Sequence, residues 1–103
     1  MNPPMLPKRP SEALNAHREE IRRIVAAHRG ANLRVFGSTL RGEDKVGSDL
    51  DILIDRQKGM TLFDLCALWH EVETLLGVPV DVVSSGSLNP RWGSQVLAEA
   101  QPI

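Results

Sequence analysis

Two aspartates alternate with apolar residues in the segment "DLDILID", residues 49–55. On an extended strand, side chains two positions apart point to the same face, so Asp49 and Asp51 project together while Leu50 and Ile52 face the core. Two neighbouring carboxylates repel each other, and this repulsion raises one pKa unless a cation lies between them. Mg²⁺ prefers oxygen ligands and shares them with substrate phosphates. The pair therefore indicates a magnesium site.

A third acid has the same apolar setting. Asp81 lies between valines in "VPVDVV", residues 78–83. If this strand is the neighbour of 49–55 in the sheet, Asp81 lies beside Asp49 and Asp51. Three carboxylates can hold two metal ions roughly 3.5–4 Å apart, one activating a hydroxyl nucleophile and one stabilising a leaving phosphate. Taken alone, each acid has a plainer interpretation, an exposed strand end or an edge position.

A glycine-serine pair precedes the aspartates. Gly37-Ser38 follows the apolar segment "NLRVF", residues 32–36, and can open a helical turn. Glycine allows a phosphate to approach the backbone, and free N–H groups together with the Ser38 hydroxyl can bind its oxygens. Arg41, one turn later, can contact phosphate or brace the loop. A simple turn is the alternative interpretation.

The remaining pattern predicts one small domain, residues 11–103, after a proline-rich flexible arm at residues 1–10. Helical periodicity, caps and alternation predict an α+β fold, a small mixed sheet with helices packed mainly on one face. The expected helices are 12–29 after a Ser11 cap, 60–77 with a Thr61–Asp64 capping box and a Gly77 end, and about 90–100 after Asn89; the expected strands are 32–36, 49–55 and 78–83.

Composition excludes several classes of protein. The chain has 103 residues, 42% hydrophobic and 24% charged, with a net charge of −1. This balance argues against general nucleic-acid binding, and neither a membrane helix nor a signal peptide is expected, so a cytoplasmic location is predicted. The first half of the chain is basic and the second acidic. This asymmetry is either a feature of the solvated surface or an acidic cation site beside a basic flank.

Other polar and aromatic residues were weighed. Cys66 and Trp69 are expected to fill the core, Leu62 is placed on the buried stripe of its helix, and Asp44 is expected to be solvated in the loop. The three histidines are interpreted as structural or surface residues.

The motif "FGSTLRG…GSDLDILI" resembles the nucleotidyltransferase superfamily that includes DNA polymerase beta. It looks like the minimal nucleotidyltransferases, the MNT proteins of prokaryotic HEPN/MNT toxin–antitoxin pairs. Arg41-Gly42 and Ser48 also lie where that group's pattern places them. The resemblance covers roughly residues 11–103 and departs at Leu40, a packing position where alanine is common.

The resemblance implies Mg²⁺-dependent transfer of AMP from ATP, with two metal ions and release of pyrophosphate. Asp49, Asp51 and Asp81 would bind the metals, and Asp81 would help to activate the acceptor hydroxyl. Gly37 and Ser38 would hold the triphosphate, with Arg41 and Ser48 also on the nucleotide side. In the studied pairs the acceptor is a tyrosine of a HEPN ribonuclease toxin, so such a toxin is the expected partner; no membrane or direct nucleic-acid partner is expected.

Two alternatives stay open at this point. The chain can be a binding antitoxin that neutralises its partner by covering it, with weak or vestigial catalysis, although three retained acids argue mildly against this. It can also be a nucleotidyltransferase that acts on a small molecule, although such enzymes usually need a further domain for the acceptor. The sequence does not give the nucleotide preference, the number of transfers or the oligomeric state.

Overall fold

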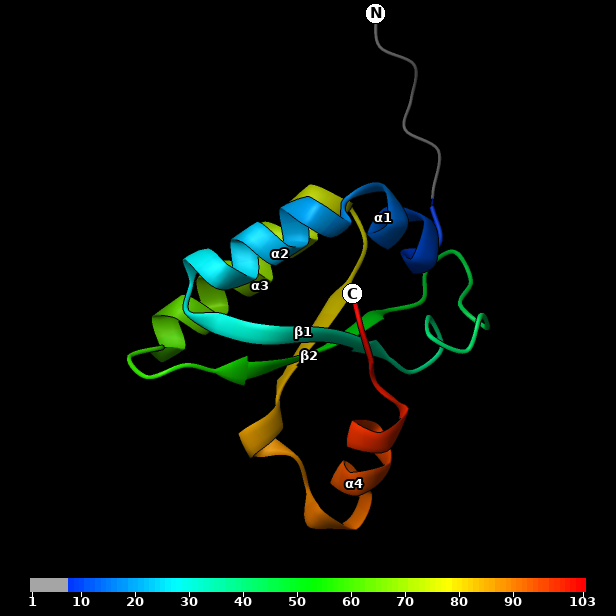
Figure 1. Cartoon of the computed structure of the whole chain (residues 1–103). Helices are drawn as coiled ribbons and strands as arrows, with labels where there is room; N and C mark the ends of the chain where they lie inside the picture. The colour runs from blue at the N-terminus through cyan, green and yellow to red at the C-terminus, as the bar shows by residue number, and fades with distance from the viewer. Residues whose placement is uncertain (1–7) are drawn as a thin grey trace, which may run out of the picture.

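The computed structural model describes residues 8–103 as one sheet with helices on either side of it (Figure 1). This confirms the predicted α+β class and the mixed sheet. The elements are α1 (Pro10–Ala16), α2 (Arg18–Ala27), β1 (Gly30–Phe36), β2 (Leu50–Arg56), α3 (Leu62–Leu76), β3 (Val80–Ser84), the 3₁₀ turn η1 (Ser85–Ser87), α4 (Pro90–Glu99) and β4 (Gln101–Pro102).

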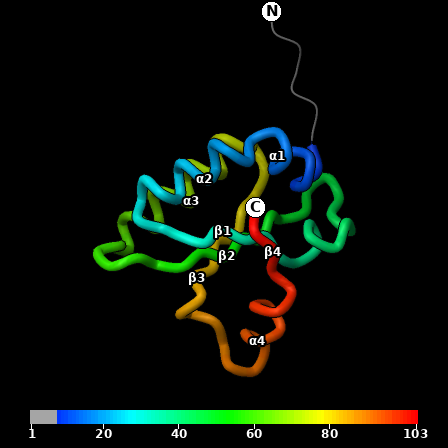
Figure 2. The backbone as a smooth tube through the Cα atoms, viewed as in Figure 1, coloured from blue at the N-terminus to red at the C-terminus, as the bar shows by residue number. Residues whose placement is uncertain are grey.

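The four strands lie in the order β3-β2-β1-β4 (Figure 2). β1 is antiparallel to both β2 and β4, whereas β2 and β3 are parallel. Parallel neighbours need a long crossover, and α3 supplies it between β2 and β3. The sequence argument required these two strands to be adjacent, and the structure confirms that they are.

The main core lies between the sheet and three helices. Leu50, Ile52 and Ile54 of β2 are fully buried and belong to one apolar cluster with residues of α1, α2 and α3, including Ile21 and Leu68. Alternate positions of a strand face opposite sides, so the aspartates of β2 must face away from this cluster. In Figure 1, α1, α2 and α3 lie on one side of the sheet and α4 lies on the other.

Helix α3 begins and ends where its sequence predicts. Thr61 Oγ1 accepts the N–H of Asp64, and the helix ends at Gly77, whose φ of +67° is left-handed. The predicted apolar stripe is wrong at its first residue, because Leu62 is 68% exposed. Cys66 is also exposed rather than in the core. The residues of α3 that are buried in the core are Leu68, Val72 and Leu76.

The single helix predicted at 12–29 is two helices. The chain breaks at His17, whose φ of −134° and ψ of 24° are not helical. The predicted cap is also displaced, because α1 begins at Pro10 with Arg9 as its N-cap residue and Ser11 lies inside the first turn. Gly30 starts β1, and Arg29 makes the turn between α2 and β1 with a φ of +63°.

The C-terminal region confirms one prediction and adds an element. Asn89 caps α4 by accepting the N–H of Arg91 at 2.9 Å, and Pro90 is the first helical residue. The sequence pattern missed β4, which pairs with Arg34 and Val35 of β1. Among the helices of residues 8–103, none is both long enough and apolar enough to cross a membrane. Most of the predicted arm falls in residues 1–7, outside the described part of the chain.

Gly77→Ala should lower the free energy of unfolding by about 1–2 kcal/mol, the penalty of a left-handed φ for a residue with a Cβ. No atom lies within 4 Å of the added Cβ, so backbone strain is the only change. Urea denaturation measures the loss. Gly86→Ala is the matched control, since it has equally open space and no positive φ. Equal stability of the two variants would contradict the interpretation of Gly77.

Candidate active site

The aspartates meet where β2 and β3 begin. Asp51 of β2 and Asp81 of β3 are register partners in the parallel pair, so they share one face of the sheet about 4.8 Å apart along the hydrogen-bonding direction. Asp49 lies exposed just before β2. The structure therefore brings the three predicted acids to one end of the sheet.

The charges of these acids interact. Partial burial is the main reason that the pKa of Asp51 rises to about 6, and the charges of Asp81 and then Asp49 raise it further. Arg41 opposes the shift. A carboxylate surrounded in this way is unfavourable without a counter-ion, which is the electrostatic setting that a bound cation relieves.

Gly37 brings the backbone directly against Asp51. β1 ends at Phe36, the antiparallel partner of Asp51, and Gly37 then turns with a φ of +74°. A Cβ at this position would collide with Asp51 Oδ2. Only glycine therefore lets the turn and the carboxylate lie this close together.

The glycine-serine pair opens one helical turn, residues 37–42, as the sequence suggested. Arg41 N–H donates to Gly37 O at 3.2 Å and Gly42 N–H donates to Thr39 O at 3.3 Å. The first N–H groups of a helical turn have no acceptor within it, so they are available to bind phosphate oxygens. The Asp51 carboxylate lies beside the start of this turn.

Arg41 braces the turn against the C-terminal helix. Its guanidinium donates to Glu99 Oε1 of α4 at 2.7 Å and to Glu43 Oε2 at 3.4 Å. The hydrogen bond to Glu99 is the main reason that the pKa of Arg41 is raised. Of the two roles predicted for Arg41, the structure shows the bracing contact, and the phosphate contact stays a prediction.

Ser48 is occupied locally. Its Oγ accepts the N–H of Lys45 at 2.9 Å, and its own N–H donates to Lys45 O at 2.9 Å. These two bonds close a turn immediately before Asp49 and so fix the entry to β2. A nucleotide contact by Ser48 stays a prediction.

The acids fit a metal that also takes ligands from substrate. Within residues 8–103, no group of three or more His, Cys, Asp or Glu side chains is arranged as a metal-binding cluster. Mg²⁺ usually binds through one or two carboxylates and completes its shell with water and substrate phosphates. The oxygen donors of Asp49, Asp51 and Asp81, with the Gly37 turn beside them, suit that mode of binding.

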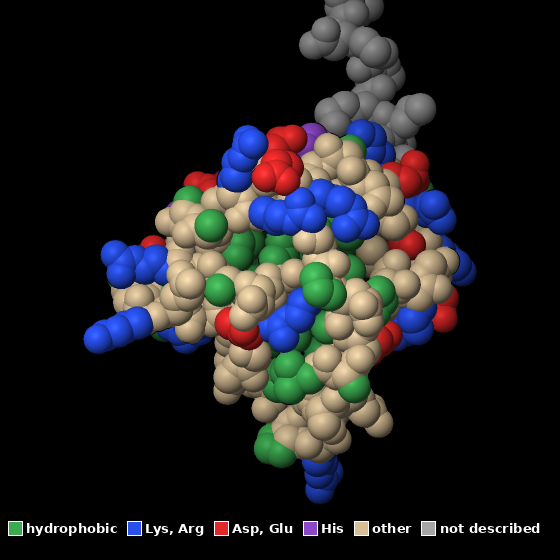
Figure 3. Space-filling view, in the orientation of Figure 1, with side chains coloured by type: hydrophobic (Ala, Val, Ile, Leu, Met, Phe, Trp, Pro, Cys, Tyr) green, Lys and Arg blue, Asp and Glu red, His purple; other side chains and the backbone are tan. Residues whose placement is uncertain are grey.

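Two grooves of the described surface lie away from the acids. The larger, about 320 Å³, lies between α2, β1 and β4 and is lined by residues including Arg22, Leu33 and Ile103. Figure 3 shows hydrophobic side chains between α2 and the sheet on this face. The second, about 280 Å³, is lined by four residues of α3, Cys66, Trp69, His70 and Glu73. At the acidic end of the sheet, Asp49 and Asp81 are exposed.

Sequence reasoning missed the residues that hold β3 in place. Trp69 Nε1–H donates to Val80 O at 2.6 Å, and Glu73 Oε2 accepts the N–H of Val80 at 3.0 Å. Val80 immediately precedes Asp81, so α3 fixes the start of the strand that carries this acid. Helical periodicity placed Trp69 in the core, but no sequence pattern marks an indole N–H or a glutamate as a partner of a strand end.

Gly37→Ala and Gly42→Ala form a matched pair for the contact with Asp51. Both glycines have positive φ, but a Cβ at Gly42 has no atom within 4 Å. Gly42→Ala should cost about 1–2 kcal/mol of unfolding free energy from strain alone. Gly37→Ala should cost roughly 2 kcal/mol more, because Asp51 must move. Equal losses in urea denaturation would mean that the close approach imposes no constraint.

The pKa of Asp51 predicts a pH-dependent stability in buffer free of divalent cations. Because its folded-state pKa of about 6 lies above the ordinary 3.8, its stabilising contribution is complete below pH 4 and is lost as pH rises through 6. Between pH 4 and 7 the free energy of unfolding of wild type should therefore fall by about 1 kcal/mol, a value that allows for solvent screening. The Asp51→Asn variant should not show this fall. Urea titrations across this range measure the difference.

Asp55→Asn is the control for this titration. Hydrogen bonds, chiefly from Asn32, lower the pKa of Asp55, so its contribution to stability grows with pH and is nearly complete by about pH 5. Asp55→Asn should therefore still show the loss of stability with rising pH that Asp51 causes. An Asp51→Asn profile parallel to that of wild type over this range would contradict the raised pKa.

Comparison with known proteins identifies the family of this chain. A family model described as nucleotidyltransferase domain matches residues 14–100. The protein adenylyltransferase MntA of Thermococcus cleftensis is 38% identical over 86 residues, which cover 84% of each chain. A solved structure described as "putative minimal nucleotidyltransferase" is 46% identical with a TM-score of 0.83, covering 90% of this chain and 95% of that one.

A second solved structure, a toxin–antitoxin with AMP-PNP, has a TM-score of 0.69 at 20% identity, covering 81% of this chain and 68% of that one, and it supports the fold alone. The nucleotidyltransferase domain model spans most of the chain. The chain therefore belongs to the nucleotidyltransferase family and is an enzyme of its minimal type.

Proposed function

We propose that this chain is an antitoxin that transfers AMP from ATP to a hydroxyl group, a tyrosine, of a HEPN-type ribonuclease toxin in the cytoplasm. The observation that supports the proposal is the register of Asp51 with Asp81 beside the Gly37 turn. Acids suited to a cation thereby lie close to the turn at residues 37–42, which we propose as the phosphate seat. The Thermococcus cleftensis relative is named a protein adenylyltransferase, and one structural neighbour is a toxin–antitoxin with AMP-PNP.

Each of the predicted site residues has a separate role in the proposed reaction. Gly37 and Ser38 hold the triphosphate through backbone N–H groups and the hydroxyl, while Asp49, Asp51 and Asp81 hold Mg²⁺. Mg²⁺, two ions in the full site, supplies charge neutralisation at the triphosphate and makes the acceptor hydroxyl more acidic. Asp81 is exposed at the open end of the sheet, where it accepts the proton of an incoming hydroxyl.

The transfer exchanges one P–O bond for another and moves one proton. The acceptor oxygen attacks the α-phosphorus of ATP, its proton passes to Asp81, and the bond between the α-phosphorus and the bridging oxygen breaks. Pyrophosphate leaves with the electron pair of that bond. Arg41 and Ser48 complete the nucleotide side, which for Arg41 requires a change of partner from Glu99 to phosphate.

The open site favours a protein as the acceptor. Asp49 and Asp81 are exposed, and neither acid lines the grooves described above, so both carboxylates are open to a large partner surface. A partner protein can supply such a surface together with the hydroxyl. This consideration favours a toxin over a small molecule as the acceptor.

The double variant Asp49→Asn/Asp51→Asn should abolish AMP transfer, because amides cannot hold the cation that the carboxylates hold. Purified protein, ATP, Mg²⁺ and the purified partner toxin are combined, and intact-mass spectrometry counts additions of AMP to the toxin. Wild type should add at least one and the variant none. Undiminished modification by the variant would overturn the assignment of these acids.

The same variant distinguishes catalysis from neutralisation by binding. If the chain silences its toxin by modification, cells expressing the toxin should not recover when the double variant replaces wild type. Copurification of the variant with the toxin controls for loss of folding or binding. Full rescue by a variant that transfers no AMP would instead identify a binding antitoxin.

A further inference from the structure

The loop between the phosphate seat and the aspartates has one buried residue in addition to the surface contact of Arg41 with Glu99. From Arg41 to Asp49, every residue is exposed or half-buried except Asp44, whose exposed fraction is 3%. The neighbouring Val46 is 58% exposed. The sequence interpretation placed Asp44 in solvent, and this was wrong.

Asp44 is buried because it caps a helix far away in sequence. Its Oδ2 accepts the N–H of Ser11 at 2.8 Å. Ser11 N–H is one of the first donors of α1, which an intrahelical acceptor cannot satisfy. The N-cap residue of α1 is Arg9, whose side chain has no acceptor atom, so Asp44 performs the task that an N-cap side chain normally performs.

The environment keeps Asp44 ionised. Burial alone would raise its pKa, but the hydrogen bonds from Ser11 and the nearby charge of Arg9 outweigh burial and lower the pKa overall. A carboxylate at a helix N-terminus is also favoured by the helix dipole. Among residues 8–103, Asp44 Oδ1 is buried without a hydrogen-bond partner, and Asp44 Oδ2 is held by the N–H of Ser11.

From Asp44 the connection continues to the phosphate seat. The adjacent Glu43 N–H donates to Ser38 O at 2.9 Å, and Gly42 N–H donates to Thr39 O. A fixed Asp44 therefore limits where Glu43 and Ser38 can lie. On its other side the loop leads through the Lys45–Ser48 turn to Asp49.

We propose that Asp44 is a positioning residue for nucleotide binding, which latches the 37–49 loop to the N-terminus of α1 and so holds the phosphate seat and Asp49 in register. The proposal rests on the proposed function, since it concerns the same ATP site. It assigns Asp44 no contact with substrate. Its effect passes through the backbone of Glu43 and Ser38.

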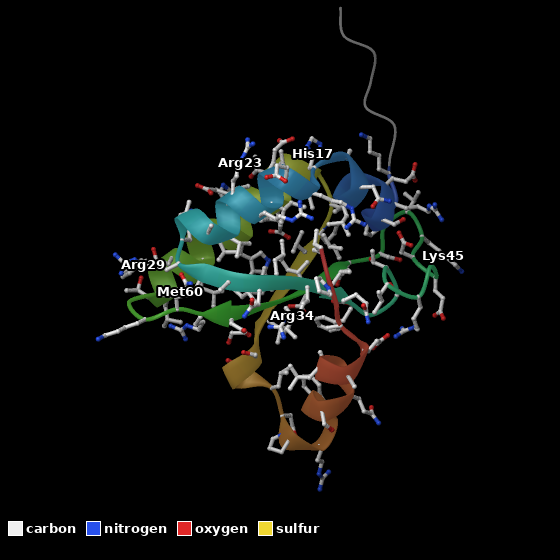
Figure 4. The ribbon with its side chains drawn as sticks, in the orientation of Figure 1. His17, Arg23, Arg29, Arg34, Lys45 and Met60 are labelled. Atoms are coloured by element: carbon white, nitrogen blue, oxygen red, sulfur yellow. The ribbon has the colours of Figure 1, made fainter. Side chains whose placement is uncertain are left out.

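The experiment compares three variants of the full chain. Asp44→Ala removes the latch, whereas Asp44→Asn keeps an oxygen that can accept the Ser11 N–H. Thr61→Ala removes the N-cap of α3, a loss of about 1 kcal/mol comparable to that of a cap on α1. Lys45 and Met60, labelled in Figure 4, show that the two caps lie at opposite ends of the molecule.

The readouts are calorimetric binding of AMP-PNP with Mg²⁺ and hydrogen exchange of the amides of residues 38–43. Asp44→Ala should weaken binding about five- to tenfold and speed exchange in this segment. Asp44→Asn should restore most of both, and Thr61→Ala should change neither despite its lower unfolding free energy.

The possible failures are distinguishable. Equal binding and equal exchange in Asp44→Ala and Thr61→Ala would overturn the proposal, as would failure of Asp44→Asn to rescue. Wild type that binds no nucleotide would instead overturn the proposed function, and the exchange pattern would still decide whether Asp44 latches the loop.

Discussion

The partly buried carboxylate of Asp51, held beside Asp81, is the constraint on which the candidate site depends. The parallel pairing of β2 and β3 forces the two carboxylates into register, and partial burial prevents water from screening them fully. A fold that only had to be stable would place one of these acids elsewhere. On the opposite face of the sheet lies the apolar cluster, with Ile52 and Ile54 fully buried. Burial of this cluster offsets the cost of holding the two carboxylates close together.

Elements with strong local signals were predictable from sequence. The Thr61 cap, the left-handed Gly77 and the Asn89-Pro90 start are set by residues adjacent to the helix ends they define. The break at His17 was not, because helical periodicity continues on both sides of it. The two-residue β4 has no periodicity to detect and is defined only by its pairing with β1.

In the candidate site too, local sequence patterns were predictive and tertiary contacts were not. Alternation of acidic and apolar residues predicted a shared face for Asp49 and Asp51. The prediction that Asp81 lies beside them depended on β2 and β3 being neighbours, which they are. The partners of these acids are tertiary. Glu99 reaches Arg41 from 58 residues away and Ser11 reaches Asp44 from 33 residues away, and neither pairing leaves a periodic pattern. The assumption that loop acids are solvated failed at Asp44 because a helix end needed an acceptor.

The hydrogen bonds of Trp69 and Glu73 to Val80 connect α3 to the candidate active site. The sequence of the helix does not indicate this connection. β3 is an edge strand, and these two side chains occupy both backbone groups of the residue before Asp81. Helix and strand end therefore move as one body, and any displacement of α3 is transmitted to the acid that meets the acceptor. Tolerance to substitution on this helix is accordingly set by the accuracy of the active site as well as by the core.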